Sequence, residues 1–205
     1  MDVRFTDEFD GGFGWTVADK LPRTAHALAT SQGVWLVDPV DAPAAVERAR
    51  GLGEISGVIQ LLDRHSRDCE ALAAQLGVPR FEVPAEEIPG STLLVLPIVR
   101  SRFWNEVALW SNEHRTLVCA DALGTLPFFR APGERLGLHP LLRLRPTLVT
   151  RSLRGLTPEH VLCGHGEGVH GETAAAVLEE ALSTARRRLP RAWANAARQL
   201  ARRRS

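Results

Sequence analysis

Lysine is almost absent from this chain of 205 residues, since Lys20 is the only lysine among 25 basic residues. The formal net charge is only +1, but the charges are unevenly spread along the chain. Acidic groups outnumber basic ones in residues 1–60, whereas residues 181–205 hold eight arginines and no carboxylate side chain. The near-neutral total therefore says little about local electric fields.

Cysteine is scarce, and no long apolar run is present. The chain has three cysteines at wide spacing, Cys69, Cys119 and Cys163, and it does not begin with an apolar signal segment. We therefore expect a reducing, cytoplasmic setting. The longest uncharged apolar stretch covers residues 91–99, far short of the ~20 residues that a membrane helix needs. We expect no membrane span and no membrane partner.

The composition, with 44% hydrophobic and 24% charged residues, is that of a globular domain with a substantial core. It excludes intrinsic disorder and small disulfide scaffolds. No fixed-period repeat and no linker interrupts the chain. We predict a single domain over residues 1–190, followed by a basic C-terminal tail over residues 191–205.

Short β-rich runs alternate with helical patterns in both halves of the chain. Apolar β runs predict strands over residues 12–17, 25–30, 33–37, 55–62, 92–97, 107–110, 116–120 and 160–163. Helical patterns predict helices over residues 43–53, 70–77, 152–156 and 172–189, and residues 122–150 read as an irregular connection. This mixture predicts an α/β sandwich whose sheets are covered by helices.

Polar residues gather at the carboxyl end of three of these apolar runs, in residues 63–69, at Asp121 and in residues 164–170. Side chains at strand ends can converge on one rim, and Asp, Cys and His are ligands that suit zinc. Each group taken alone is also ordinary loop chemistry. For example, Asp68 could cap the helix that follows it, and His165 lies between two turn glycines.

Taken in order, these landmarks resemble the metallo-β-lactamase fold superfamily over roughly residues 33–182. Gly33-Val-Trp-Leu-Val-Asp-Pro39 looks like its strand that ends in Asp-Pro, and Leu61-Leu-Asp-Arg-His-Ser-Arg-Asp-Cys69 aligns on its T-H-x-H-x-D-H loop. Cys119-Ala-Asp-Ala-Leu123 is similar to its G-D-A-L segment, and residues 152–166 resemble its helix, strand and G-H-G turn. The resemblance implies a four-layer αββα sandwich with the site along the sheet edge.

The first metal site of that family does not carry over. The resemblance puts Arg64 and Ser66 where its first two histidines stand, and Arg102 where its third stands. A guanidinium group is permanently charged and has no free lone pair, so it cannot ligate a cation. That half of the site should not hold a metal.

The second half keeps ligand atoms, because Asp68, Cys69, Asp121 and His165 occupy its positions. We therefore expect these four as metal ligands, with Asp68 and Asp121 also as catalytic residues. Two alternatives remain open. The site holds one zinc or another divalent ion, or an arginine pairs with the carboxylates and the site is free of metal.

With a metal, the resemblance implies a hydrolase that acts on a small anionic ester, thioester or related substrate. Arg64 and Arg102 would then clamp the anionic group, Ser66 would donate a hydrogen bond, and His170 would touch the substrate. Without a metal, the protein is a non-catalytic relative whose arginine-lined pocket binds an anion or a protein partner. His65 is expected to point away from the site.

The expected partner is thus a small anionic molecule, and Trp104 and Trp110 could serve a homo-oligomer interface. The arginine-rich tail invites comparison with nucleic-acid-binding segments. Cations also suit the last turns of a helix for electrostatic reasons, so a nucleic-acid partner is not expected.

Overall fold

The first six strands form one sheet in chain order. The computed structural model describes residues 3–17 and 22–202. The sheet consists of β1 (Val3–Phe9), β2 (Gly12–Val17), β3 (Arg23–Thr30), β4 (Gly33–Val37), β5 (Ile55–Gln60) and β6 (Arg80–Glu82). Strands β1 to β4 form an antiparallel meander, whereas β4, β5 and β6 run parallel. The parallel pairs are joined by crossover helices, as parallel pairing requires. These are α1 (Pro43–Leu52) and α2 (Cys69–Leu76), which ends at Gly77 in the left-handed conformation.

A second sheet of five strands follows, in the order β13-β12-β9-β8-β7. Its members are β7 (Leu94–Ser101), β8 (Trp104–Ser111), β9 (Thr116–Cys119), β12 (His160–Cys163) and β13 (Val169–His170). The segment between β9 and β12 holds the small pair β10 (Leu123–Gly124) and β11 (Gly137–Leu138), the 3₁₀ turn η1 (Leu142–Leu144) and α3 (Thr147–Leu153). Helices α4 (Ala174–Thr184) and α5 (Leu189–Arg202) complete the described chain.

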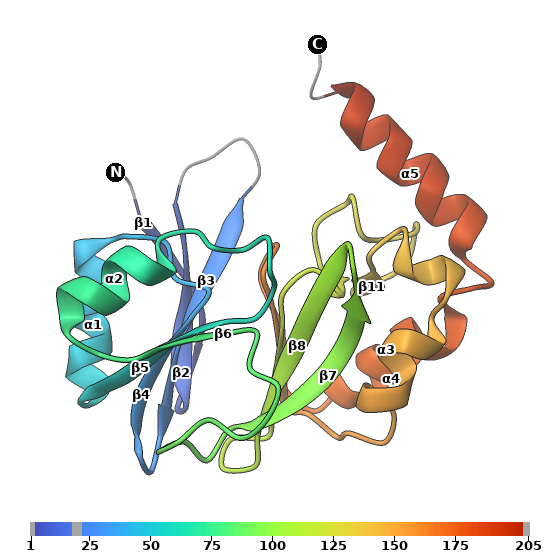
Figure 1. Cartoon of the computed structure of the whole chain (residues 1–205). Coiled ribbons are helices and arrows are strands. Elements are labelled where there is room, and N and C mark those ends of the chain that lie inside the picture. The colour runs from blue at the N-terminus through green and yellow to red at the C-terminus, as the bar shows by residue number, and fades with distance from the viewer. Residues whose placement is uncertain (1–2, 18–21, 203–205) are drawn as a thin grey trace.

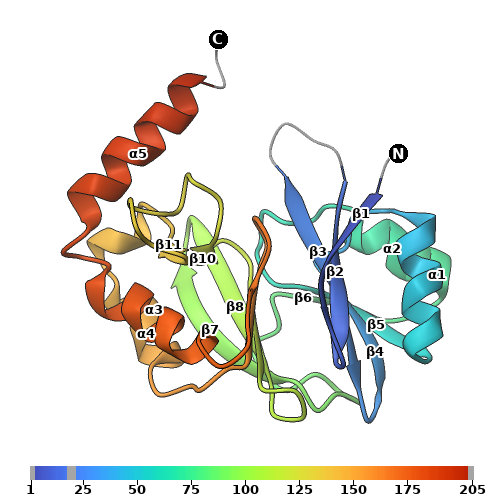
Figure 2. The ribbon, with the colours of Figure 1, turned by 180° about the vertical axis from the view of Figure 1, so that it is seen from behind.

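The two sheets pack face to face, with α1 and α2 outside the first and α3 and α4 outside the second (Figures 1 and 2). Buried side chains of both sheets, among them Trp35, Ile59, Leu109 and Leu162, form the central core. A second core, which includes Trp15 and Leu72, lies between the first sheet and its helices. The predicted four-layer αββα sandwich is confirmed, and burial of these large side chains stabilises it by about 1.5–3 kcal/mol each.

Helix α5 departs from this compact arrangement. Both views show it extending away from the body (Figures 1 and 2). It begins at Leu189, close to the predicted start of the tail, and residues 203–205 of that tail lie outside the described residues. Within the described residues, no helix combines the length and the apolar character that crossing a bilayer requires.

Candidate metal centre

Strand register brings two of the expected residues together. Strands β9 and β12 are parallel neighbours in which Cys119 pairs with Cys163. Asp121 and His165 each lie two residues beyond that pair, so they emerge side by side at the same sheet edge. The loop after β5 reaches this edge from the other sheet, because Leu62 forms a bridge with Glu106 of β8.

Three donor atoms converge at this edge. The Oδ1 atom of Asp121 lies 3.1 Å from Nε2 of His65 and 3.1 Å from Nε2 of His165. All three donor atoms lie within 4.8 Å of one another. Both histidines are buried, and Asp121 is half-buried. The cluster is thus compact and largely shielded from solvent.

The partners of the two imidazoles determine where their protons lie. Nδ1 of His165 is 2.9 Å from the carbonyl of Pro22, which can only accept, so this nitrogen is the donor. Nδ1 of His65 is 3.0 Å from Oδ2 of Asp38, whose other oxygen accepts the Leu61 N–H at 2.8 Å. Each ring therefore donates from Nδ1, which leaves a lone pair on Nε2 when the ring is neutral.

This arrangement fits a divalent metal. Neither 3.1 Å contact has the alignment of a hydrogen bond, and the buried Oδ1 of Asp121 has no hydrogen-bond partner. Nε2 of both imidazoles and Oδ1 of Asp121 thus face a common point, where a divalent cation would take the place of the imidazole protons. Two histidines and one carboxylate are also the ligand set of many catalytic zinc sites, which keep a fourth position open.

The charged groups of the cluster shift one another's pKa values. Burial alone would raise the pKa of Asp121, but the imidazoles of His165 and His65 hold it well below its usual range. Burial would lower the pKa of His65, whereas Asp121 and Asp38 outweigh that effect and raise it to about 9. The carboxylate oxygen is therefore ionised and ready to bind a cation.

A buried carboxylate supports the Asp121 loop from beneath. Glu106 accepts the N–H groups of Ala120 at 3.1 Å and Ala122 at 2.8 Å, which flank Asp121, and the indole N–H of Trp104 at 2.8 Å. Burial, aided by the charge of Asp121, raises the pKa of Glu106 to about 8. The Asp121 backbone is thus fixed by a side chain of the neighbouring strand.

A half-buried arginine also supports the site. The guanidinium of Arg67 donates to the carbonyls of Thr24 at 2.8 Å, Asp38 at 2.7 Å and Gly164 at 3.2 Å. Burial lowers its pKa. One of these carbonyls belongs to Asp38, which orients His65, and another belongs to Gly164, which precedes His165. Sequence reasoning missed Arg67, because its partners lie far away along the chain.

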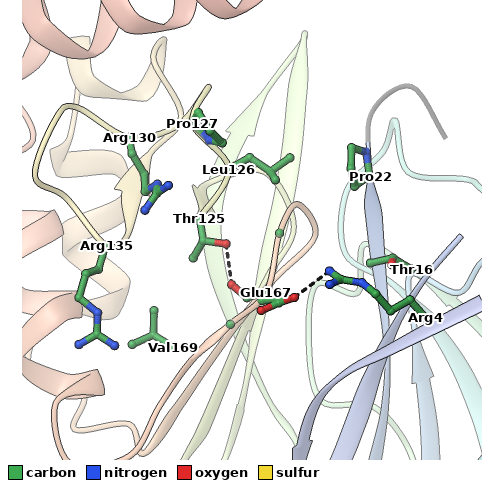
Figure 3. Close-up of a pocket in the computed structure, with 12 residues that line it drawn as sticks. Arg4, Thr16, Pro22, Thr125, Leu126, Pro127, Arg130, Arg135, Glu167 and Val169 are labelled. Carbon is green, nitrogen blue, oxygen red and sulfur yellow. Dashed lines mark hydrogen bonds and ion pairs between the residues drawn. The ribbon is translucent and has the colours of Figure 1, made fainter. Parts of the chain in front are cut away.

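A pocket of about 430 Å³ lies beyond His165, and its lining includes Pro22, whose carbonyl contacts Nδ1 of His165, and Gly166, the next residue along the chain. The three donor residues do not line it. Figure 3 shows Arg130 directed into this space and the ion pair between Arg4 and Glu167, which measures 2.7 Å. Arg135 lines the same pocket. Nε of Arg130 is buried and has no hydrogen-bond partner. The pocket therefore offers cationic groups that an anion could pair with.

No family model and no curated protein matches the chain. Solved structures do match it over most of its length. The chain aligns with the DIM-1 metallo-β-lactamase at a TM-score of 0.56 and 11% identity, covering 93% of this chain and 98% of that one. A metallo-β-lactamase from Hirschia baltica aligns at a TM-score of 0.58 and 11% identity, covering 90% of this chain and 98% of that one. The chemotaxis sensor ODP aligns at a TM-score of 0.57 and 13% identity, covering 89% of this chain and 94% of that one. The chain has the metallo-β-lactamase fold. At this level of identity the likeness concerns the fold alone.

Within this fold, the side chains that lie together differ from the donor set expected from the sequence. Asp121 and His165 meet as predicted, but the third donor is His65. The Asp68 carboxylate instead accepts the backbone N–H of Asp41 at 2.8 Å. Cys69 is buried among the side chains between α2 and the first sheet, and burial raises the pKa of its thiol to about 12. A protonated thiol is a poor metal ligand.

The backbone explains this exchange. Arg67 has φ of 40°, in the left-handed region, so the chain turns sharply just before Asp68. Cys69 then begins α2 and faces the core, with its sulfur 3.7 Å from the carbonyl of His65. His65, which lies before the turn, is held toward Asp121 by Asp38. The alignment of loop positions could not reveal this change of direction.

Of the residues expected to bind substrate, Arg64 lies beside the donors. Its guanidinium stacks over the Trp104 ring at 4.5 Å, with Nη2 3.9 Å from Oδ2 of Asp121. The side chain is 50% exposed, so it remains accessible to a ligand. Ser66 in the same loop is exposed, and no side-chain contact to the three donors is found among the described residues.

Arg102 and His170 lie elsewhere. Arg102 is exposed in the turn between β7 and β8, with its guanidinium 5.5 Å from the ring centre of Phe103. The expected arginine clamp does not form, because the hairpin turn carries Arg102 to the surface. His170 is held by Asp7 at 2.9 Å and by His160 at 2.9 Å. These contacts tie it to strands β1 and β12 instead of the donor cluster.

Proposed function

We propose that this protein is a single-metal hydrolase of the metallo-β-lactamase fold, with His65, Asp121 and His165 as its metal ligands. The convergence of the three donor atoms around a buried, unpartnered Asp121 oxygen carries this proposal. The ligand set retains Asp121 and His165 from the sequence prediction and replaces Asp68 and Cys69 with His65. Asp121 keeps its predicted catalytic role as a ligand of the reacting centre.

Each supporting group has a defined task in this proposal. Asp38 and the Pro22 carbonyl hold both rings in the tautomer that presents Nε2, as partners of metal-bound histidines commonly do. The Asp121 carboxylate neutralises part of the cation's charge. A bound divalent metal would supply Lewis-acid polarisation of the scissile carbonyl and activate water for attack.

The cationic surroundings favour an anionic substrate. Arg64 stands next to Asp121, and Arg130 and Arg135 line the pocket beyond His165. Guanidinium groups bind carboxylates and phosphates with paired, charge-assisted hydrogen bonds. We therefore propose a small ester, thioester or related substrate that bears a carboxylate or phosphate group. We also propose a reducing, cytoplasmic location, which the three free, buried cysteines support.

The first test is metal binding by protein purified without a histidine tag. Elemental analysis and titration with zinc should give one ion per chain. His65→Ala, Asp121→Asn and His165→Ala should each lower the zinc affinity by more than about 100-fold, because each removes or weakens one of only three protein ligands. Asp68→Asn is the matched control from the same loop, and its affinity should stay within a few-fold of the wild type.

The opposite pattern would identify the ligands expected from the sequence: loss of zinc in Asp68→Asn and Cys69→Ser with His65→Ala unchanged. Absence of stoichiometric zinc, iron or manganese would favour the metal-free, anion-binding protein instead. Activity is assayed with a nitrophenyl ester that bears a carboxylate and with its neutral analogue. Arg130→Gln should reduce kcat/KM for the anionic ester about tenfold and leave the neutral one unchanged.

A further inference from the structure

Exposed apolar side chains concentrate on η1, α3 and α5 and directly beside them. The described part of the chain has eight large hydrophobic side chains that are exposed; four of them lie on these segments and a fifth, Leu141, directly precedes η1. They are Leu141 (59% exposed), Leu144 (47%), Leu148 (41%), Trp193 (44%) and Leu200 (49%). Trp193 connects the two parts, because its indole N–H donates to the carbonyl of Pro140 at 2.9 Å. Such a concentration marks an interaction site.

The same segments are strongly basic. Seven exposed arginines lie on them or next to them: Arg145, Arg151, Arg154, Arg186, Arg187, Arg191 and Arg198. None of the seven forms an ion pair with another described residue. Residues 135–158 and 181–205 contain no carboxylate side chain. The guanidinium groups on this surface are therefore free to meet an external negative charge.

Helix α5 contacts the body of the protein along one side only. Ala192 and Ala196 are buried against the body, and the amide of Asn195 donates to the carbonyls of Pro127 and Arg130. Leu200 continues the stripe of Trp193 and Ala196 at helical spacing, but it lies beyond the anchored half and is exposed. Its helix extends away from the body (Figure 1). The apolar stripe of α5 thus extends beyond the part of the body that covers it, which leaves Leu200 exposed.

We propose that this surface, made of η1, α3 and α5, docks on an anionic phospholipid bilayer. An amphipathic helix with arginines on its polar side and Trp and Leu on the other lies in the interfacial plane of such membranes. A hollow of about 560 Å³ next to it, lined by Leu148 and Arg151 of α3 and by Ile98 and Arg100 of β7, suits a phosphate headgroup. This mode of binding needs no membrane-spanning helix, but it departs from the expectation from the sequence that the chain has no membrane partner.

Charge distinguishes this occupant from the alternatives. A second copy docked face to face would bring seven unpaired arginines against seven others, which repel each other. Nucleic acid would satisfy the arginines but would leave the exposed leucines without apolar contact. An anionic bilayer satisfies both, since its phosphates pair with guanidinium groups and its acyl chains cover aliphatic side chains.

The test is co-sedimentation of the full chain with two kinds of vesicle, phosphatidylcholine alone and phosphatidylcholine mixed with phosphatidylglycerol. The protein should sediment with the mixed vesicles only and should be released by high salt. The double variant Leu141→Ser/Leu200→Ser and the double variant Arg191→Gln/Arg198→Gln should each weaken binding roughly tenfold or more. All four side chains are exposed, so these variants should keep their circular dichroism spectra and melting temperatures.

Matched controls come from other surfaces of the chain. Leu52→Ser/Leu94→Ser and Arg50→Gln/Arg102→Gln change exposed residues of the same types and should bind like the wild type. Equal binding to both vesicle types, or to neither, would overturn the proposal. So would loss of binding in the arginine variant with full binding in the leucine variant, because that pattern describes a polyanion such as nucleic acid.

Discussion

At the scale of single residues, a side chain that never touches the ligand position can decide whether the site forms. Glu106 is such a residue, since it accepts N–H groups from both neighbours of Asp121. Its carboxyl group is fully buried, and burial raises its pKa to about 8. A buried acid of this kind is retained at a cost in free energy, which argues that its hydrogen bonds matter to the structure.

Replacing Glu106 with leucine should therefore lower the free energy of unfolding by roughly 3–5 kcal/mol, because three buried N–H donors lose their acceptor. The free energy of unfolding of Glu106→Gln should lie between those of the wild type and Glu106→Leu. Glutamine keeps an oxygen for Ala120 and Ala122 but turns an NH₂ group toward the indole N–H of Trp104. Urea denaturation followed by tryptophan fluorescence measures both values. The exposed Glu86→Leu is the control, and equal stability of Glu86→Leu and Glu106→Leu would contradict the argument.

At the scale of elements, the segment between β9 and β12 holds only short regular elements, and one buried ion pair helps to order it. Arg143 is fully buried and donates to Glu134 at 3.1 Å, to the carbonyl of Leu138 at 3.1 Å and to that of Phe129 at 3.0 Å. Phe129 in turn stacks on His165. Sequence patterns indicated an irregular connection here, because the contacts that order it are side-chain to backbone and follow no period.

Arg143→Met should destabilise the protein by about 3 kcal/mol, since it leaves Glu134 buried with only Arg188, 3.6 Å away, as a cationic neighbour. The double variant Arg143→Met/Glu134→Leu should recover part of that loss, because it removes the stranded charge as well. Thermal unfolding of both variants, with the exposed Arg145→Met as control, measures the difference. A loss of stability in the double variant that exceeds the summed losses of Arg143→Met and Glu134→Leu would refute this account.

At the scale of the whole molecule, local pattern predicted the layers better than it predicted the site. The meander over β2 to β4, the helix α1 and the helix α2 closed by Gly77 follow from periodicity and turn residues. Strand β1 was not predicted, because its sequence VRFTDEF mixes charged and apolar residues and only three-dimensional pairing with β2 makes it a strand. Asp121 and His165 were predicted as site residues because each follows the carboxyl end of an apolar run, and the register of β9 and β12 places them side by side.

His65 could not be chosen in the same way. Its orientation depends on Asp38, 27 residues earlier, and on the turn at Arg67. A loop aligned position by position assigns Asp68 and Cys69 instead. Contacts between distant segments decide which side chains of a polar loop face the site, and one sequence does not display them.

Arg67 joins the two halves of the sandwich, because Thr24 and Asp38 belong to the first sheet's segments and Gly164 follows a strand of the second. Arg67→Lys keeps the charge, but a single ammonium group cannot reach all three carbonyls. We expect a loss of about 2 kcal/mol in stability. We also expect a drop in zinc affinity of about tenfold, because Gly164 precedes His165 and Asp38 orients His65.

Both effects are separable by experiment. Zinc titration well below the melting temperature reports the geometry of the folded site, whereas calorimetry reports the stability of the sandwich. Arg50→Lys is the matched control, since that arginine is exposed and pairs with the exposed Glu47. If Arg67→Lys lost stability but bound zinc like the wild type, Arg67 would hold the sheets together without positioning the donors. If it lost neither stability nor zinc affinity, the Arg67 guanidinium would have no part in coupling the sheets to the site.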